Sequence, residues 1–168
     1  DNSNYLLSGI TAENPEFGYA VSADFFFQVV FVATAMSIVS GAVAERMKLF
    51  AFLAFAVVMT GFIYPMEGHW TWGEAPVFGM YTLGDLDFSD FAGSGIVHMA
   101  GAAAGVAGVL VIGARKGKYG ADGSINAIPG ANLPLATLGT FILWLGWFGF
   151  NGGSVLATAS VADSTAVA

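Results

Sequence analysis

The sequence predicts an all-α, polytopic membrane domain with four spanning helices. Of its 168 residues, 56% are hydrophobic and 10% are charged, and the mean hydropathy is +0.71. A soluble core of this size would not normally hold so much apolar surface, so a bilayer is the simplest solvent for it. The apolar residues fall into four runs, each close to the ~20 residues that a helix needs to cross hydrocarbon.

The four predicted spans belong to a single membrane domain covering 1–168 and lie at about 24–45, 48–68, 91–114 and 134–154. The second run is the shortest, although Trp70 or Trp72 could extend it to the interfacial level, where aromatic rings are enriched. In the third run, Gly101 and Gly105 belong to a small-residue face that would let another helix approach closely. The links at 69–90 and 117–134 are rich in Gly and Pro, as turn-rich connections usually are.

Basic residues predict the orientation of the spans. Two links carry all five of them, which are Arg46, Lys48, Arg115, Lys116 and Lys118. Because cytoplasmic loops carry an excess of Lys and Arg, we expect residues 45–48 and 115–133 in the cytoplasm. Most acids lie at the opposite ends of the runs, so the segments expected outside are 1–24, 69–90 and 155–168.

Composition argues against several classes of function. The formal net charge is -7, which disfavours nucleic acid as a partner because phosphates need Lys and Arg to neutralise them. The chain has no cysteine, which excludes disulfides, thiolate nucleophiles and Cys-ligated metals within it. His69 lies near Glu67 in the sequence, but one histidine with one acid is weak evidence for a metal. The sequence therefore predicts no cofactor, no resident metal and no enzymatic activity.

His98 is an ionisable residue inside the third run, eight residues after Asp90. On a helix that Asp90 caps, this spacing places the ring about 12 Å deeper. Ionisable residues in spanning segments usually face a bundle interior or a water-filled path. Imidazole can donate at one nitrogen and accept at the other, so it can hold a neutral polar solute or relay a proton. A hydrogen-bonded structural histidine is the alternative.

Five other residues each have a structural and a functional interpretation. Asp90 could cap a helix, attract a cation, or do both. Trp72 could anchor the chain at the membrane interface or hold a cation on its ring face. Ser154, at the outer end of the fourth run, could bond to a neighbouring backbone or accept a hydrogen bond from an incoming cation. Phe31 and Phe150 are two of fifteen phenylalanines, and each taken alone predicts only a core or lipid-facing ring.

Four blocks of sequence resemble the ammonium transporter family, and its Amt/Mep branch more than its Rh branch. They are "FVATAMSIVSGAVAERMK", "YPMEGHWTWG", "DFAGSGIVHMAGA" and "PLATLGTFILWLGWFGFNGGS", in matching order over about residues 25–154. The resemblance implies a fold of eleven spanning helices, built from two inverted five-helix halves and a last helix. This chain would be a partial ammonium-transporter fold, a fragment that supplies the third to sixth helices.

The resemblance also implies a substrate-binding and pore-lining set. Trp72 and Ser154 resemble the outer-vestibule groups that recruit ammonium. Phe31 and Phe150 resemble the paired rings that close the vestibule. The implied function is ammonium transport, in which external NH4+ is recruited, deprotonated and passed as NH3 along a histidine-lined pore, with or without a separately relayed proton.

Two further roles come from the same resemblance. Asp90 resembles the family aspartate that supports the outer site, and His98 resembles the first of the twin histidines that line the narrow pore. Nothing after Ser154 resembles the second histidine, so this chain alone should not form a closed pore. The implied partners are ammonium or its analogue methylammonium, membrane lipid and the other subunits of a homotrimer, with a cytoplasmic PII-type regulator left open. The implied location is the cell (plasma or inner) membrane.

Two competing functions stay open from the sequence. The same fold could serve an ammonium sensor that signals through added domains. An intramembrane enzyme could use His98, His69 and Asp90, although it would need a nucleophile or a metal set that this chain lacks. If the family resemblance were accidental, the fallback would be a four-helix membrane module in which His98 is structural.

Overall fold

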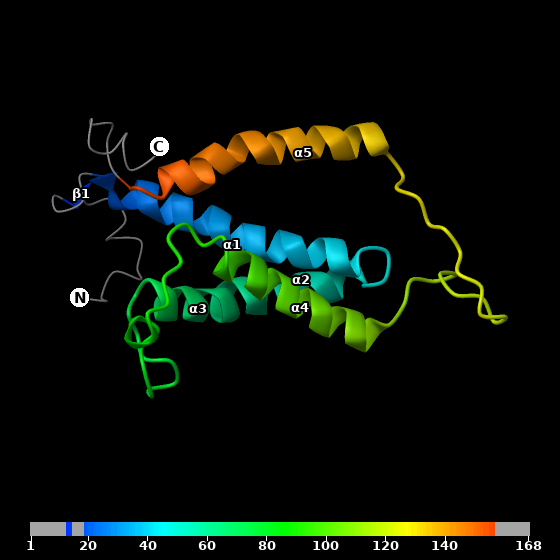
Figure 1. The fold of residues 1–168 in the computed structure, drawn as a ribbon, viewed down its shortest axis with the longest axis horizontal. Helices are drawn as coiled ribbons and strands as arrows, with labels where there is room; N and C mark the ends of the chain where they lie inside the picture. Colours follow the sequence, from blue (N-terminus) through cyan, green and yellow to red (C-terminus); the bar gives the residue numbers. More distant parts are fainter. Residues whose placement is uncertain (1–12, 15–18, 157–168) are drawn as a thin grey trace. The chain divides into compact units, whose positions relative to one another are not determined.

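The computed structural model describes residues 13–14 and 19–156. The outside segments expected within 1–12, 15–18 and 157–168 lie beyond the described residues. The described chain is mostly helical (Figure 1), which confirms the all-α prediction. Two compact units can be distinguished, one made of the described residues up to Val29 and from Pro129, the other of Val30–Ile128.

The elements follow one another in a simple order. They are β1 (Glu13–Asn14), β2 (Tyr19–Ala20), α1 (Val21–Val43), α2 (Leu49–Val58), the π turn η3 (Met59–Ile63), α3 (Tyr64–Thr71), the 3-10 turn η4 (Gly84–Leu86), α4 (Ile96–Ile112), α5 (Leu133–Trp147) and the π turn η5 (Phe148–Gly152). Strands β1 and β2 form a short antiparallel pair.

Within the described residues, three helical stretches are long and apolar enough to cross a membrane. They are Val21–Val43, Leu49–Thr71 and Leu133–Gly152, whereas α4 is a shorter apolar helix of 17 residues. Within the predicted third span, 91–114, the helix begins later than expected, because α4 starts at Ile96. The residues between Asp90 and Ile96 form a turn instead, held by the Asp90 side chain.

In the unit Val30–Ile128, α1 and α4 approach each other closely at small residues. A Cβ atom added at Gly101 would lie 2.6 Å from the Ala35 carbonyl oxygen and 2.7 Å from the Cβ of Ile38. A Cβ at Gly108 would lie 2.8 Å from a methyl group of Val43. These separations are shorter than van der Waals contact, so only glycine fits at both positions. The small-residue face predicted in the third run is thus confirmed as a helix-packing surface.

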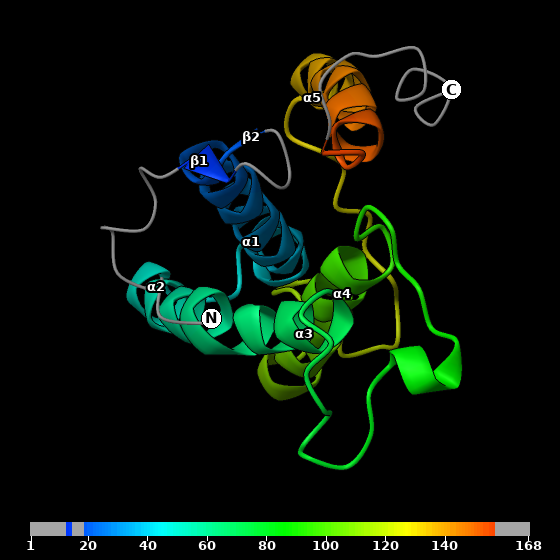
Figure 2. The same ribbon diagram turned by 90° about the vertical axis from the view of Figure 1, so that its left-hand side faces the viewer.

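The second spanning stretch is one continuous helix that passes through a π turn. Pro65 occupies the first turn of α3, where its missing N–H would leave an ordinary helical hydrogen bond unmade, and η3 lies directly before it. Because α3 continues to Thr71, Glu67 belongs to the helix. Together α1, α2, α3 and α4 line a groove of about 520 Å³ with almost entirely apolar walls, and Glu67 is its one acidic residue. Figure 2 shows these helices from a second direction.

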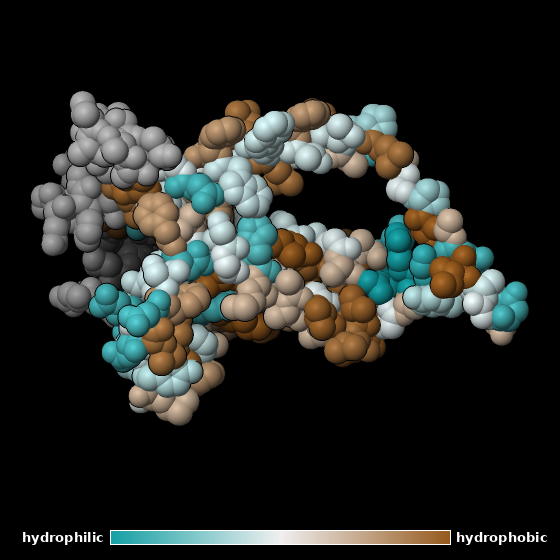
Figure 3. Space-filling view, in the orientation of Figure 1, coloured by the Kyte–Doolittle hydropathy of each residue, from teal (hydrophilic) through white to brown (hydrophobic). Residues whose placement is uncertain are grey.

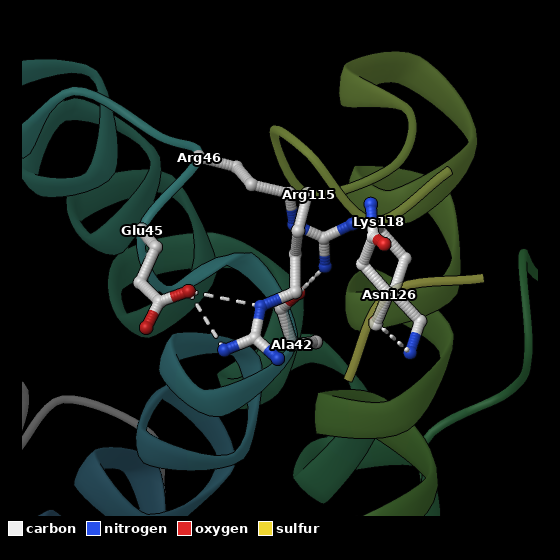
Figure 4. A network of polar contacts seen from close by, with 6 residues as sticks. All are labelled: Ala42, Glu45, Arg46, Arg115, Lys118 and Asn126. Carbon is white, nitrogen blue, oxygen red and sulfur yellow. Dashed lines mark hydrogen bonds and ion pairs between the residues drawn. The ribbon is translucent and has the colours of Figure 1, made fainter. Parts of the chain in front are cut away.

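Polar residues gather where α1 and α4 end (Figure 4). Arg46 donates to the carbonyl oxygens of Ala42 and Gly113, the latter at 2.5 Å. The C-terminal ends of both helices thus share one guanidinium. Its positive charge also interacts favourably with the partial negative charge at the C-terminal end of each helix dipole. Glu45 accepts from Arg115 at 2.7 Å in an exposed ion pair. Figure 3 shows hydrophilic side chains around the segment that follows α4 and apolar ones along the helix itself.

In the other unit, α5 begins at a capped turn and buries no side chain of its own. The Asn132 side chain accepts from the Leu135 amide at 2.9 Å, and Pro134 occupies the first turn. Apolar side chains cover the helix on all sides, with Leu145 75% exposed and Leu135 62% exposed. A helix that is apolar all round belongs in lipid or against other apolar helices.

We expect Gly101→Ala to destabilise the folded protein. The added methyl group would overlap the Ala35 carbonyl oxygen, and overpacking of this kind costs about 1–3 kcal/mol. Gly41→Ala is the matched control, because Gly41 lies on α1 with open space around its Cβ position. Thermal denaturation in detergent micelles should show a lower midpoint for Gly101→Ala only. Equal midpoints for the two variants would contradict the close approach of α1 and α4.

Arg46→Ala should cost more stability than Arg115→Ala. The first substitution leaves two helix-terminal carbonyls without their charged donor, a loss of about 1–3 kcal/mol. The second removes an exposed ion pair worth at most about 1 kcal/mol, and raising the salt concentration should shrink its effect further. Thermal denaturation at low and high salt measures both. A larger loss for Arg115→Ala would mean that the ion pair, and not the guanidinium on the two carbonyls, holds the helix ends.

Candidate functional site

Asp90 organises the turn that leads into α4. Its Oδ1 accepts from the Gly93 amide at 3.0 Å, and its Oδ2 accepts from the Ile96 amide at 2.8 Å. Ile96 is the first residue of α4, so the carboxylate satisfies a donor that the helix itself cannot pair. The capping interpretation of Asp90 is confirmed, with the difference that the cap reaches across a five-residue turn.

Trp72 lies against the same turn. Its indole Nε1 donates to the backbone carbonyl of Asp90 at 2.7 Å. The outer edge of its six-membered ring rests over Gly93, where an added Cβ would lie 3.0 Å from Cη2. Trp72 is 37% exposed, so part of the ring stays open to its surroundings. Asp90 and Trp72, 18 residues apart in the chain, are therefore brought together by the structure.

His98 is the third residue of α4 and is half-buried. The depth expected from a helix that begins at Asp90 does not apply, because residues 91–95 form a turn and α4 begins only at Ile96. His98 therefore lies in the first turn of α4. Phe31 lies on α1 in the same unit and is buried, with 4% exposure.

Phe150 and Ser154 lie in the other unit, at the end of α5. The Ser154 hydroxyl donates to the Phe150 carbonyl at 2.6 Å, and the rings of Trp147 and Phe150 lie 5.5 Å apart with a tilt of 50°. The hydroxyl donor of Ser154 is thus used locally, while its oxygen can still accept a hydrogen bond. A Cβ at Gly153 would lie 3.4 Å from the Phe27 ring, which places an additional ring beside this turn.

The loop between α3 and α4 carries negative charge close to Trp72 and Asp90 in the sequence. Hydrogen bonds from the hydroxyl and the amide of Thr82 lower the pKa of Asp85 below its usual range, and the Thr82 amide lies 3.1 Å from its Oδ2. This carboxylate therefore stays ionised well below neutral pH. Among the described residues, no three His, Asp or Glu side chains gather closely enough to hold a metal ion.

Sequence reasoning missed two residues of this region. Gly93 has a positive φ of 91° and is buried under the Trp72 ring. Tyr64 begins α3 and is 2% exposed. The glycine in "DFAGSG" was visible as a turn signal, but its conformation and the ring above it depend on contacts between distant segments. Tyr64 carried no signal that separated it from the other aromatic residues.

Comparison with known proteins decides the family. A profile described as "Ammonium Transporter Family" matches residues 3–168. The chain belongs to this family. The ammonium transporter resemblance seen in the sequence is thereby confirmed, and family membership together with the apolar helices makes this a membrane protein.

Related ammonium transporters share about half of their residues with the chain over the aligned regions. Ammonium transporter Amt2 of Archaeoglobus fulgidus is 49% identical over 136 residues, which cover 79% of this chain and 29% of that protein. Ammonium transporter Amt1 of Haloferax mediterranei is 48% identical over 141 residues, covering 80% and 27% respectively. This chain therefore spans less than a third of the length of either relative.

A solved structure supports the family's fold. The chain matches a protein described as "Sensor Amt Protein" with a TM-score of 0.73 and 44% sequence identity, over 85% of this chain and 35% of that one. The described helices are accordingly part of the ammonium transporter fold.

Asp90→Ala should fray the start of α4. It removes the acceptors of the Gly93 and Ile96 amides, and the loss of such a cap costs about 0.5–2 kcal/mol. Amide hydrogen exchange, followed by NMR or mass spectrometry, should accelerate at both positions. Asp90→Asn retains one acceptor oxygen, so its exchange rates should lie between those of the unaltered protein and those of Asp90→Ala. The control is Ser94→Ala, at an exposed position of the same turn, which should leave the rates unchanged. Unchanged exchange in Asp90→Ala would refute the capping role.

Proposed function

We propose that this chain is a segment of an ammonium transporter in the cell (plasma or inner) membrane. In this proposal external NH4+ is recruited at an outer vestibule, deprotonated, and passed as NH3 along a histidine-lined pore, with or without a separately relayed proton. The single observation that carries the proposal is the contact of Trp72 with the Asp90 turn. This contact brings an aromatic ring, a helix-capping carboxylate and the first residue of α4 together in a chain that belongs to the ammonium transporter family.

Recruitment follows from the cost of dehydrating a cation. Removing an ion from water is expensive unless protein groups replace its hydration shell. The ring face of Trp72 supplies a cation–π contact worth about 0.5–2 kcal/mol. The Asp90 carboxylate has its two oxygens engaged by amides, so it acts by charge on the site and by holding the turn. Ser154 is proposed as a hydroxyl acceptor at the same vestibule.

Passage beyond the vestibule favours the neutral species. We propose that Phe31 and Phe150 are the paired rings that close the vestibule, so that NH4+ loses its remaining water there. NH3 crosses an apolar constriction far more cheaply than NH4+ because it carries no charge. His98 then offers one ring nitrogen as donor and the other as acceptor, which suits either a neutral solute or a relayed proton.

The proposal includes the surroundings of the segment. The full-length protein is proposed to be a homotrimer with one pore in each subunit, and a cytoplasmic PII-type regulator would act on the face that carries Arg46 and Arg115. The proposed orientation puts the link 45–48 and the segment 115–133 in the cytoplasm. The proposed chemistry is limited to binding, transfer of a proton from NH4+ to water outside or to an imidazole relay, and release of the substrate, so the proposed protein is a transporter and not an enzyme.

A sensor function is the second candidate. One observation favours it, namely that the matched solved structure is described as a "Sensor Amt Protein". A sensor could use the same cation site at Trp72 and Asp90 without sustained flux. Transport and sensing therefore differ in the measured passage of substrate and not in the outer site.

Uptake of labelled methylammonium by cells without their own ammonium transporters tests the proposed function. The full-length protein is compared with Trp72→Leu and His98→Ala at matched membrane abundance, and His69→Ala is the control because it changes an exposed histidine. Trp72→Leu should raise the KM about 2- to 30-fold through the lost cation–π contact. His98→Ala should lower the maximal rate or change ion selectivity, by roughly tenfold for each 1.4 kcal/mol of barrier.

Two results would contradict the proposal. An unaltered protein that reaches the membrane but takes up no methylammonium would reject transport in favour of sensing. Full uptake by His98→Ala, equal to that of His69→Ala, would leave transport standing and reject the pore role of His98.

A further inference from the structure

Trp72 is held at two points, and one of them is a glycine. The indole Nε1 donates to the Asp90 carbonyl at 2.7 Å, which fixes one edge of the ring. The Cζ2–Cη2 edge of the six-membered ring, which adjoins the N–H edge, lies over Gly93, where an added Cβ would come within 3.0 Å of Cη2 and 3.1 Å of Cζ2. A hydrogen bond alone leaves the ring free to tilt about it, so the second contact decides the tilt.

The backbone of Gly93 is suited to this contact for two reasons. Its φ of 91° lies in a region that residues with a side chain rarely adopt. Its amide donates to Asp90 Oδ1 at 3.0 Å, so the residue is anchored by the same aspartate whose carbonyl accepts from Trp72. The third neighbour, a methyl group of Val97, would lie 3.1 Å from an added Cβ. A side chain at this position would therefore meet the Trp72 ring on one side and α4 on the other.

We propose that Gly93 is a positioning residue for Trp72, whose bare backbone seats the indole edge and so sets the tilt at which the ring presents its face to a cation. The inference rests on the proposed function for its consequence, namely substrate recruitment, and on the structure for its geometry. In Gly93→Ala the indole edge shifts by a few tenths of an ångström to make room for the methyl group, which changes the tilt of the ring and lengthens its hydrogen bond to Asp90.

The first test observes Trp72 directly and is independent of transport. The indole N–H signal of Trp72 is assigned in 15N-labelled full-length protein by its loss in Trp72→Phe. Gly93→Ala should shift this signal and accelerate its hydrogen exchange at least severalfold. Gly79→Ala is the control for backbone strain, since Gly79 has a φ of 75° and open space around its Cβ position, and it should leave the signal unchanged. An unchanged Trp72 signal in Gly93→Ala would overturn the proposal.

The second test measures uptake kinetics. Gly93→Ala should raise the KM for methylammonium as Trp72→Leu does and leave the maximal rate per transporter near that of the unaltered protein. In a Trp72→Leu background, Gly93→Ala should add little, because the ring that it displaces is already absent. Equal effects of Gly93→Ala with and without the tryptophan would reject the positioning role while leaving the proposed transport intact.

If Gly93→Ala misfolds, a double variant still tests the proposal. Phenylalanine at position 72 lacks the part of the indole that overlaps the new methyl group. If Gly93→Ala fails to reach the membrane but Gly93→Ala with Trp72→Phe does so, the overlap with the ring is the cause, as proposed. If both fail while Gly79→Ala is normal, Gly93 serves the backbone or its contact with Val97, and the proposal is wrong.

Discussion

The start of α4 depends on the two hydrogen bonds that the Asp90 carboxylate accepts. One bond fixes the Gly93 amide in a turn with positive φ, and the other starts α4 at Ile96. The same residue turns its own backbone carbonyl toward Trp72. A single residue thus sets where the helix begins, through its side chain, and where the aromatic ring is tethered, through its backbone carbonyl. His98 lies in the first turn of α4 as a consequence.

The C-terminal ends of α1 and α4 are stabilised by a different side chain. Helices in lipid must satisfy their terminal carbonyl groups with protein donors or at the interface. Arg46 meets this need at the ends of α1 and α4, and the close approach at Gly101 holds the two helices together along their length. Neither device relies on a hydrophobic driving force, which is weak between helices in lipid. Packing of small residues and bonding of helix ends carry that role.

Much of the fold could be predicted from the sequence because its signals are local. Apolar runs of about 20 residues and the small residues at Gly101 and Gly105 follow directly from composition. The start of α4 could not be predicted, since an apolar stretch beginning at 91 looks helical until the Asp90 side chain captures the amides of the turn. The predicted second span, 48–68, already included Glu67, and α3 runs three residues beyond that span, to Thr71.

The candidate site was predicted in part. The proximity of Trp72 and Asp90 was implied only by the family resemblance, because 18 residues separate them in the chain and no spacing rule brings them together. Gly93 shows the limit more sharply. A glycine in a turn is ordinary, and its importance lies in the missing atom beneath an indole ring, which becomes visible only when the distant ring has been placed.

A cation site at the surface of a membrane protein must balance attraction against release. A carboxylate free to bind NH4+ directly would hold it firmly and would slow its passage onward. In this structure both Asp90 oxygens accept hydrogen bonds from amides, so in the proposed site a cation would meet the Trp72 ring, tethered by the Asp90 carbonyl, and not a free carboxylate. A cation–π contact is weak enough to be left and directional enough to depend on the tilt of the ring. The hydrogen bond from Trp72 to the Asp90 carbonyl and its contact with Gly93 therefore link the structure of the turn to the binding of the proposed substrate.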